Sequence, residues 1–257
     1  MIRWFLRGVT QRRLTTRYPR AEEPPPAGFR ARVLLDPSAT NPRQASRAAQ
    51  ACLPDALTLD DQDRLRLDAA RCIGCGLCVE AIADGALGID PGYELASRSR
   101  RRLVVGDVGE ADIAAELLGG PFRRSLHIRH VDAGSDGAEE WEIQALTNPY
   151  YDMQRLGLYF TLAPRHADVL LVTGGVTHSM REPLLRTFEV MPEPKAVVAV
   201  GTDTCSGGFS ATSGEVAGGV DRVLPVDVYV PGSPPAPIAI LHGLLLAAGV
   251  VTREAAA

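Results

Sequence analysis

Three cysteines in one short run, with a fourth upstream, constrain this chain of 257 residues more than any other feature. The run is Cys72-Ile73-Gly74-Cys75-Gly76-Leu77-Cys78, and the fourth thiol is Cys52. Two-residue gaps let three thiolates leave one tight turn, and glycines inside the run free that turn from steric limits. Soft thiolates in such a pattern are ligands for an iron–sulfur cluster or for zinc. The segment is therefore a candidate metal centre with two competing occupants.

The run resembles the ligand motif of bacterial ferredoxins, which places another cysteine where this chain has Ile82. In two-cluster ferredoxins that last cysteine binds the other cluster, so its loss does not affect this one. No cysteine precedes Cys52, so the ligands of the second cluster are missing as a set. The resemblance implies one [4Fe–4S] cluster with four ligands: Cys52, Cys72, Cys75 and Cys78.

Composition indicates a soluble protein without a secretory signal. Hydrophobic residues make up 46% of the chain, and the longest apolar stretch, residues 238–251, is too short to span a bilayer. The twin arginines Arg12-Arg13 are not followed by an apolar core, as a secretory signal would require. Unpaired cysteines in such a chain are typical of the reducing cytoplasm. We expect a cytoplasmic protein.

The N-terminus is basic and the remainder is acidic. Residues 1–35 contain eight arginines and two acids, a net +6, which leaves −10 for the rest of a chain of net charge −4. Residues 2–14 place apolar side chains on one side of a helix, a pattern typical of a short amphipathic helix on a membrane or a partner. A frayed terminus is the alternative. A proline-rich tether follows at residues 22–26.

The apolar pattern divides the chain into five parts. Residues 1–32 form the leader and tether, 33–92 a ferredoxin-like module with an internal repeat, 93–125 a linker, 126–251 an α/β domain, and 252–257 a tail. The α/β prediction depends on valine-rich runs at 168–173, 196–201 and 222–230, which suit buried parallel strands. Helical patterns at 180–191 and 235–249 alternate with them. The fold class expected is therefore α/β: the small module, then a flavodoxin-like open parallel sheet.

Residues 126–249 resemble the small subunit of energy-converting [NiFe] hydrogenases of the formate-hydrogenlyase type and the terminal-cluster subunit of respiratory complex I. The matching segments are Asn148–Gly157, Ala163–Asp168, Met191–Lys195 and Val226–Pro235. The resemblance implies a hydrogenase-like or complex-I-like large subunit and membrane-arm subunits as partners. It also implies a peripheral place on the inner face of the cell membrane. We expect no nucleic-acid partner.

The resemblance also implies a proximal cluster, and here the chain departs from the pattern. Its four cysteine positions are occupied by Asp136, Glu139, Asp203 and Ser233, and oxygen ligands do not assemble a [4Fe–4S] cluster. Cys205 lies two residues from one of these positions and is expected to be a core residue. Three carboxylates and a hydroxyl suit a hard cation such as Mg²⁺ or Mn²⁺, or they pair with arginine or water.

These inferences predict an electron-transfer and docking subunit with one [4Fe–4S] cluster and without the terminal one. The alternative is a redox-silent scaffold whose cluster only stabilises the fold. A soluble carrier serving an unrelated reductase is a third hypothesis, disfavoured by the large docking domain. We identify no catalytic residues, and the chain is not expected to hold a complete active site alone.

Overall fold

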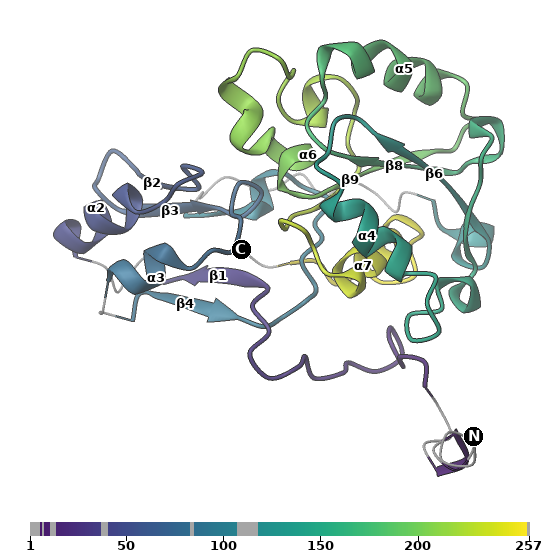
Figure 1. Ribbon diagram of the computed structural model, residues 1–257, viewed down its shortest axis with the longest axis horizontal. Helices are drawn as coiled ribbons and strands as arrows, with labels where there is room; N and C mark the ends of the chain where they lie inside the picture. Colours follow the sequence, from purple (N-terminus) through teal and green to yellow (C-terminus); the bar gives the residue numbers. More distant parts are fainter. Residues whose placement is uncertain are drawn as a thin grey trace.

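The structure is a computed structural model that describes residues 6, 8–10, 14–36, 41–82, 85–106 and 118–255. Figure 1 shows a small N-terminal module beside a larger α/β domain, with the N-terminal segment below them. Most of the predicted amphipathic leader and the middle of the predicted linker lie outside the described residues. None of the described helices is long and apolar enough to cross a membrane.

The N-terminal module consists of two strand–helix–strand units. Its elements are β1 (Arg32–Leu35), α2 (Pro42–Gln50), β2 (Leu57–Leu59), β3 (Leu65–Asp68), α3 (Leu77–Ala81) and β4 (Leu87–Asp90). The outer strands β1 and β4 pair antiparallel, as do β2 and β3. The short β5 (Val104–Val105) pairs antiparallel with β3 and adds a third strand to the second of these sheets.

The internal repeat seen in the sequence falls at equivalent places in these two units. Leu35-Asp36 and Leu67-Asp68 end β1 and β3, whereas Ala56-Leu57 and Ala86-Leu87 begin β2 and β4. The leucines of all four pairs except the partly buried Leu35 are buried in one small core that also includes Cys78. The repeat therefore produces two similar units that share one core, to which Cys78 belongs.

The α/β domain has a sheet of five parallel strands. They are β6 (Leu126–Asp132), β7 (Leu158–Phe160), β8 (Val169–Thr173), β9 (Ala196–Val200) and β10 (Val228–Val230). Their order, β10-β9-β8-β6-β7, places the first strand of the domain between the second and the third. This is the flavodoxin-like order, and its switch point lies between β6 and β8. The predicted fold class is confirmed.

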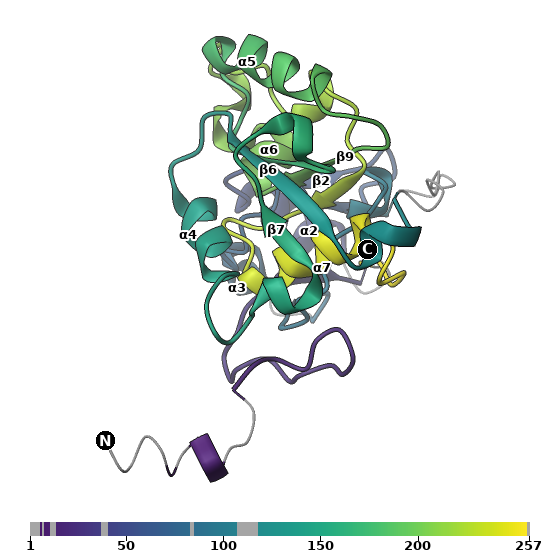
Figure 2. The same ribbon diagram turned by 90° about the vertical axis from the view of Figure 1, so that its right-hand side faces the viewer.

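Helices cover both faces of this sheet (Figure 2). They are α4 (Ala138–Ala145), α5 (His178–Glu189), α6 (Thr202–Ser206) and α7 (Pro237–Ala247). Buried residues of α4 and α7 share one core with one face of the sheet, and those of α5 and α6 share a second core with the other face. Almost every residue of α7 is buried, which explains its apolar sequence.

Short 3-10 helices connect these elements. They are η1 (Arg101–Leu103), η2 (Gly120–Arg123), η3 (Met153–Leu156), η4 (Pro164–His166), η5 (Gly208–Thr212) and η6 (Val220–Arg222). One of them corrects the predicted strand over 222–230, which begins only at Val228. Pro225 has no N–H to donate to a sheet, so the preceding residues leave it and form η6.

The segments predicted as a linker and a tail pack onto the domains. Ser97 forms an antiparallel bridge with Tyr229 of β10, while β5 pairs with the module. The backbone N–H of Ala255 donates to the carbonyl of Ala96. The described parts of both segments therefore join the N-terminal module to the edge of the parallel sheet.

The N-terminal segment also contacts the α/β domain. The N–H of Thr16 donates to the carbonyl of Tyr150, and the buried ring of Tyr18 packs edge-on against Tyr93. The proline-rich residues 22–26 that follow have no helix or strand. The leader is thus attached to the body of the molecule from residue 16 onward.

Candidate functional site

The four predicted ligands come together at one place in the N-terminal module. Cys72 and Cys75 lie on the turn between β3 and α3, Cys78 lies in the first turn of α3, and Cys52 lies in the turn after α2. All four line one pocket, together with apolar side chains of the module core. Cys78 is buried and Cys75 is exposed, so this cysteine site extends from the module core to the surface.

Backbone N–H groups approach two of these sulfurs. The N–H of Leu57 donates to Sγ of Cys52 at 3.3 Å, and that of Gly74 to Sγ of Cys72 at 3.4 Å. Gly74 has φ +67°, a conformation that side chains rarely adopt, so glycine allows the turn to close at this point. Such donors stabilise sulfur atoms that become negative.

The electrostatics of the cysteine site favour a bound cation. Burial raises the pKa of Cys52, of Cys72 and, to about 11, of Cys78. Charge on the neighbouring thiols raises each of these pKa values further. Without a cation the thiols of these residues stay protonated at neutral pH, whereas metal coordination deprotonates a thiol outright.

The arrangement provides four thiols, the number of ligands that a [4Fe–4S] cluster or a zinc ion takes. Across the described ranges, no three His, Cys, Asp or Glu side chains surround a point that one metal ion could occupy. In a [4Fe–4S] cluster each thiolate binds its own iron at a different corner of the cube. Four thiols around one pocket supply that number of ligands, and a structural zinc site takes the same number.

Three of the four residues predicted to stand at proximal-cluster positions also lie close together, at the carboxyl ends of the parallel strands. Asp136 and Glu139 follow β6, and Asp203 follows β9; we call these three the carboxyl cluster. The charges of Asp203 and Asp136 both raise the pKa of Glu139. Ser233 instead lines a pocket with Cys72 and Gly74. The described residues place no metal-holding group at the carboxyl cluster, so the hard-cation hypothesis gains no support.

Glu139 is the buried member of this cluster, with 4% of its surface exposed. A Cβ built on Gly201 would lie 2.4 Å from its Oε1, so the carboxyl fills the space left by that glycine. Its Oε2 has no hydrogen-bond partner among the described residues. Burial, followed by the neighbouring acids, raises the pKa of Glu139 to about 7.

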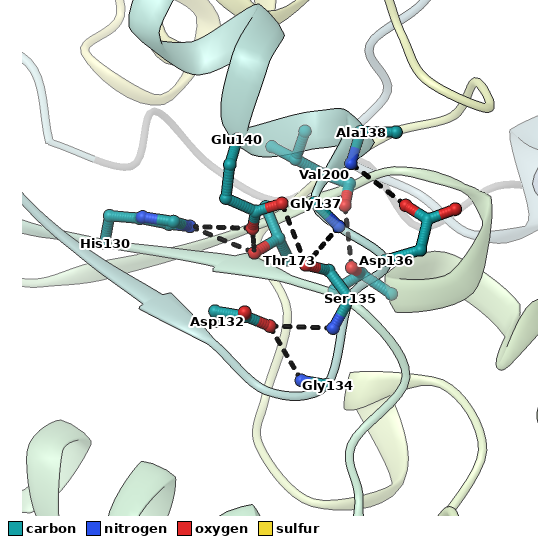
Figure 3. A network of polar contacts seen from close by, with 11 residues as sticks. His130, Asp132, Gly134, Ser135, Asp136, Gly137, Ala138, Glu140, Thr173 and Val200 are labelled. Atoms are coloured by element: carbon teal, nitrogen blue, oxygen red, sulfur yellow. Dashed lines mark hydrogen bonds and ion pairs between the residues drawn. The ribbon is translucent and has the colours of Figure 1, made fainter.

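A hydrogen-bonded network fixes the helix that holds Glu139 (Figure 3). The Glu140 carboxylate accepts from Oγ1 of Thr173 at 2.5 Å and from Oγ of Ser135 at 2.8 Å. His130 of β6 lies 3.0 Å from the same Thr173 hydroxyl, and burial lowers its pKa. Asp132 accepts from the N–H groups of Gly134 and Ser135. The network therefore joins α4 to the ends of β6 and β8, the switch point of the sheet.

This network was not anticipated from the sequence. His130 is one of several polar residues in β6, so the sequence does not single it out. Glu140 and Thr173 are unremarkable in the sequence, because their contact depends on the strand order. Cys205, expected to be a core residue, is buried in α6 with Sγ 3.7 Å from the carbonyl of Ala199.

One contact links the carboxyl cluster with the cysteine site. Oγ1 of Thr202 lies 3.3 Å from the carbonyl oxygen of Cys72 and donates to it. Thr202 stands between Gly201, against which Glu139 packs, and Asp203. The two sites are therefore adjacent across the boundary between the module and the α/β domain.

The sequence is similar to those of several known proteins. Residues 137–247 match the family described as the 20 kDa subunit of NADH ubiquinone oxidoreductase. Formate hydrogenlyase subunit 7 of Escherichia coli K12 is 40% identical over 148 residues, 58% of either chain. This chain thus spans little more than half of that relative.

Two archaeal relatives are covered more fully. The probable membrane-bound hydrogenase subunit mbhJ of Pyrococcus furiosus is 44% identical over 48% of this chain and 74% of the relative. The uncharacterized protein MJ0516 of Methanocaldococcus jannaschii is 46% identical over 51% of this chain and 90% of its own length. A solved chain of the membrane-bound sulfane sulfur reductase, an archaeal respiratory membrane complex, has 31% identity and a TM-score of 0.45, over 50% of this chain and 71% of that one.

Proposed function

Because the chain belongs to the family of the 20 kDa subunit of NADH ubiquinone oxidoreductase, we propose that it is an electron-transfer and docking subunit of a membrane-associated complex. The complex resembles energy-converting hydrogenase or complex I. The subunit has one [4Fe–4S] cluster and lacks the terminal one. The observation on which the proposal rests is the meeting of Cys52 with the cysteine run around one pocket.

The residues around that pocket contribute in different ways to a bound cluster. The cluster, when bound, supplies one-electron transfer. The module core excludes water from Cys78, while exposed Cys75 brings the site to the surface. The N–H groups of Leu57 and Gly74 stabilise the sulfurs to which they donate.

Docking is proposed for the α/β domain, because the names of two relatives describe hydrogenase subunits. Large apolar side chains there are exposed, Trp141 at 73% and Leu162 at 90%. Arg165 and His166, in a segment that matches the family, are also exposed. The partners proposed are a hydrogenase-like or complex-I-like large subunit and membrane-arm subunits, on the inner face of the cell membrane, with the basic N-terminus in contact with the membrane.

The test is electron paramagnetic resonance of the anaerobically reconstituted full chain after reduction. We expect the signal of a single [4Fe–4S] cluster, lost in the double variant Cys72→Ala, Cys75→Ala. The matched control is Cys205→Ala, which removes the remaining cysteine and should keep the signal. Two interacting clusters, or a signal that survives the double substitution, would contradict the proposal.

The alternative is a scaffold subunit in which the cluster only holds the module folded. The module core is small, and small domains depend on metals for stability. The reduction potential separates the two functions. A cluster that cannot be reduced within the physiological range favours the scaffold over the electron carrier.

A further inference from the structure

The carboxyl cluster forms a graded series from solvent to the protein interior. Asp136 is exposed, Asp203 is half-buried and Glu139 is buried. A Cβ on Gly208 would clash with Oδ1 of Asp203, as one on Gly201 would with Glu139. Each of the inner carboxyl groups thus occupies space that a glycine leaves free. The series reaches inward from the surface to a single buried end group.

Glu139, the buried end group, lacks a hydrogen-bond donor among the described residues for one of its two carboxyl oxygens. Oε2 of Glu139 is buried and accepts no hydrogen bond from the part of the chain that the structure describes. Burial of a carboxylate with one unpartnered oxygen is costly and favours the protonated form, although a hydrogen bond from the backbone N–H of Glu139 to its carboxyl group acts in the other direction. A metal cation would need several ligands around one point, and no such group exists among the described residues.

The charges around Glu139 act in the same direction. Asp203 faces it from α6, Asp136 from the loop before α4, and Glu140 is its neighbour on α4. All three are acids, and each disfavours a second negative charge nearby. Across Glu140 lies His130, whose pKa is lowered by burial, so it brings no positive charge at neutral pH.

This proton site is adjacent to the cysteine site. The Glu139 carboxyl packs against Gly201, and the next residue, Thr202, donates its hydroxyl hydrogen to the carbonyl of Cys72. Only Gly201 and Thr202 separate the Glu139 carboxyl from the Cys72 backbone, so charge added at the cysteine site acts on Glu139 across this short path.

We propose that Glu139 is a proton-binding site, filled from solvent past Asp136 and Asp203, that compensates charge at the cysteine site. When a low-potential one-electron donor adds one electron there, one proton from solvent binds Glu139 and the net charge is unchanged. The electron step rests on the proposed function, because it needs a cluster at the cysteine site. The proton site rests on the carboxyl cluster alone. A carboxyl group thus stands at a position where the resemblance implies a ligand of the proximal cluster.

The first experiment is an infrared titration of the purified full chain. A protonated buried carboxyl has a carbonyl band separate from those of carboxylates. We expect such a band to disappear with a midpoint near pH 7, to be absent in Glu139→Gln, and to titrate at lower pH in Asp203→Asn. Glu215→Gln, the same change at an exposed residue, should behave like wild type. A band that persists in Glu139→Gln, or no titration near neutral pH, would overturn the proton site.

The second experiment is a reduced-minus-oxidised infrared spectrum of the reconstituted chain, with dithionite as the one-electron reductant. At slightly alkaline pH we expect reduction to produce the acid band in wild type and not in Glu139→Gln. A cluster that is reduced without that band overturns the coupling and leaves the proposed function standing. A chain that binds no cluster overturns the proposed function and the coupling, while the pH titration still decides the proton site.

Discussion

Glu139 and Glu140 are adjacent acids with opposite surroundings. Successive residues of a helix point about 100° apart, so one can face the interior while the other faces the switch point. Glu140 accepts hydrogen bonds from two hydroxyl groups, whereas Oε2 of Glu139 accepts none from the described residues. The Glu140 carboxylate fixes α4 in place through these hydrogen bonds. The same position buries Glu139, whose raised pKa favours its protonated form.

Stability should reveal this difference through its pH dependence. The pKa of Glu139 is about 7 in the folded chain, against an ordinary value of 4.5. Below the ordinary value the side chain is protonated in both states and costs nothing. Between the two values the folded state binds more protons than the unfolded state, so the free energy of unfolding falls as pH rises. Above the pKa of the folded chain, the free energy of unfolding falls no further on account of Glu139.

The variant Glu139→Gln cannot ionise and avoids this loss. Its advantage over wild type in urea denaturation should therefore grow from acidic to neutral pH and then stay constant. Glu215→Gln is the matched control. An advantage that is the same at every pH would mean that the pKa of Glu139 is the same in the folded and the unfolded chain.

The C-terminal segment stabilises the connection between the domains. The Glu254 carboxylate, 3% exposed, accepts from Oγ of Ser97, from the N–H of Arg98 and from the Arg98 guanidinium. On α7, Nδ1 of buried His242 accepts from the N–H of Ala96, and its Nε2 donates to the carbonyl of Arg253. The segment thus ties the residues that precede β5 to the last helix.

Removing the Glu254 carboxylate should weaken this connection. We expect Glu254→Ala to lower the free energy of unfolding by about 2–4 kcal/mol, because buried donors lose their acceptor and Arg98 loses its counter-ion. The measurement is the urea midpoint. Glu189→Ala, at the exposed end of α5, is the control and should change little. Equal midpoints for Glu254→Ala and wild type would show that the segment does not stabilise the fold.

The molecule joins two parts whose hydrophobic cores differ greatly in size. The module core contains few large side chains, whereas the parallel sheet is covered by helices on both faces. Since small cores depend on metals or cross-links for stability, the two parts should differ in their need for a ligand.

Iron removal should therefore affect one part of the molecule selectively. When the reconstituted chain is treated anaerobically with an iron chelator, we expect faster amide hydrogen exchange in residues 32–90 and little change in β8 and β9. Chelator-treated Cys72→Ala, Cys75→Ala protein is the control and should show no further change. Equal exchange in the module before and after iron removal would exclude a stabilising role for the cluster.

Local spacing was enough to predict several features. Gaps of two residues defined the cysteine run, and the internal repeat identified Cys52 as the fourth candidate ligand. Valine-rich runs predicted β8 and β9, because strands buried on both faces need apolar side chains throughout. The segments shared with the family predicted the α/β domain. Each of these features depends on residues near one another in the chain or on a pattern repeated along it.

The amino-acid order thus specified the candidate ligands, the buried strands and the family. The tertiary structure alone decided which acids gather, which of them is buried, and how the carboxyl cluster meets the cysteine site through Thr202. It also packed the predicted linker and tail against the domains. The physical reason is that burial and charge interactions depend on distance in space. Only the strand order places Glu139, Asp203 and Cys72 near one another from three separate segments.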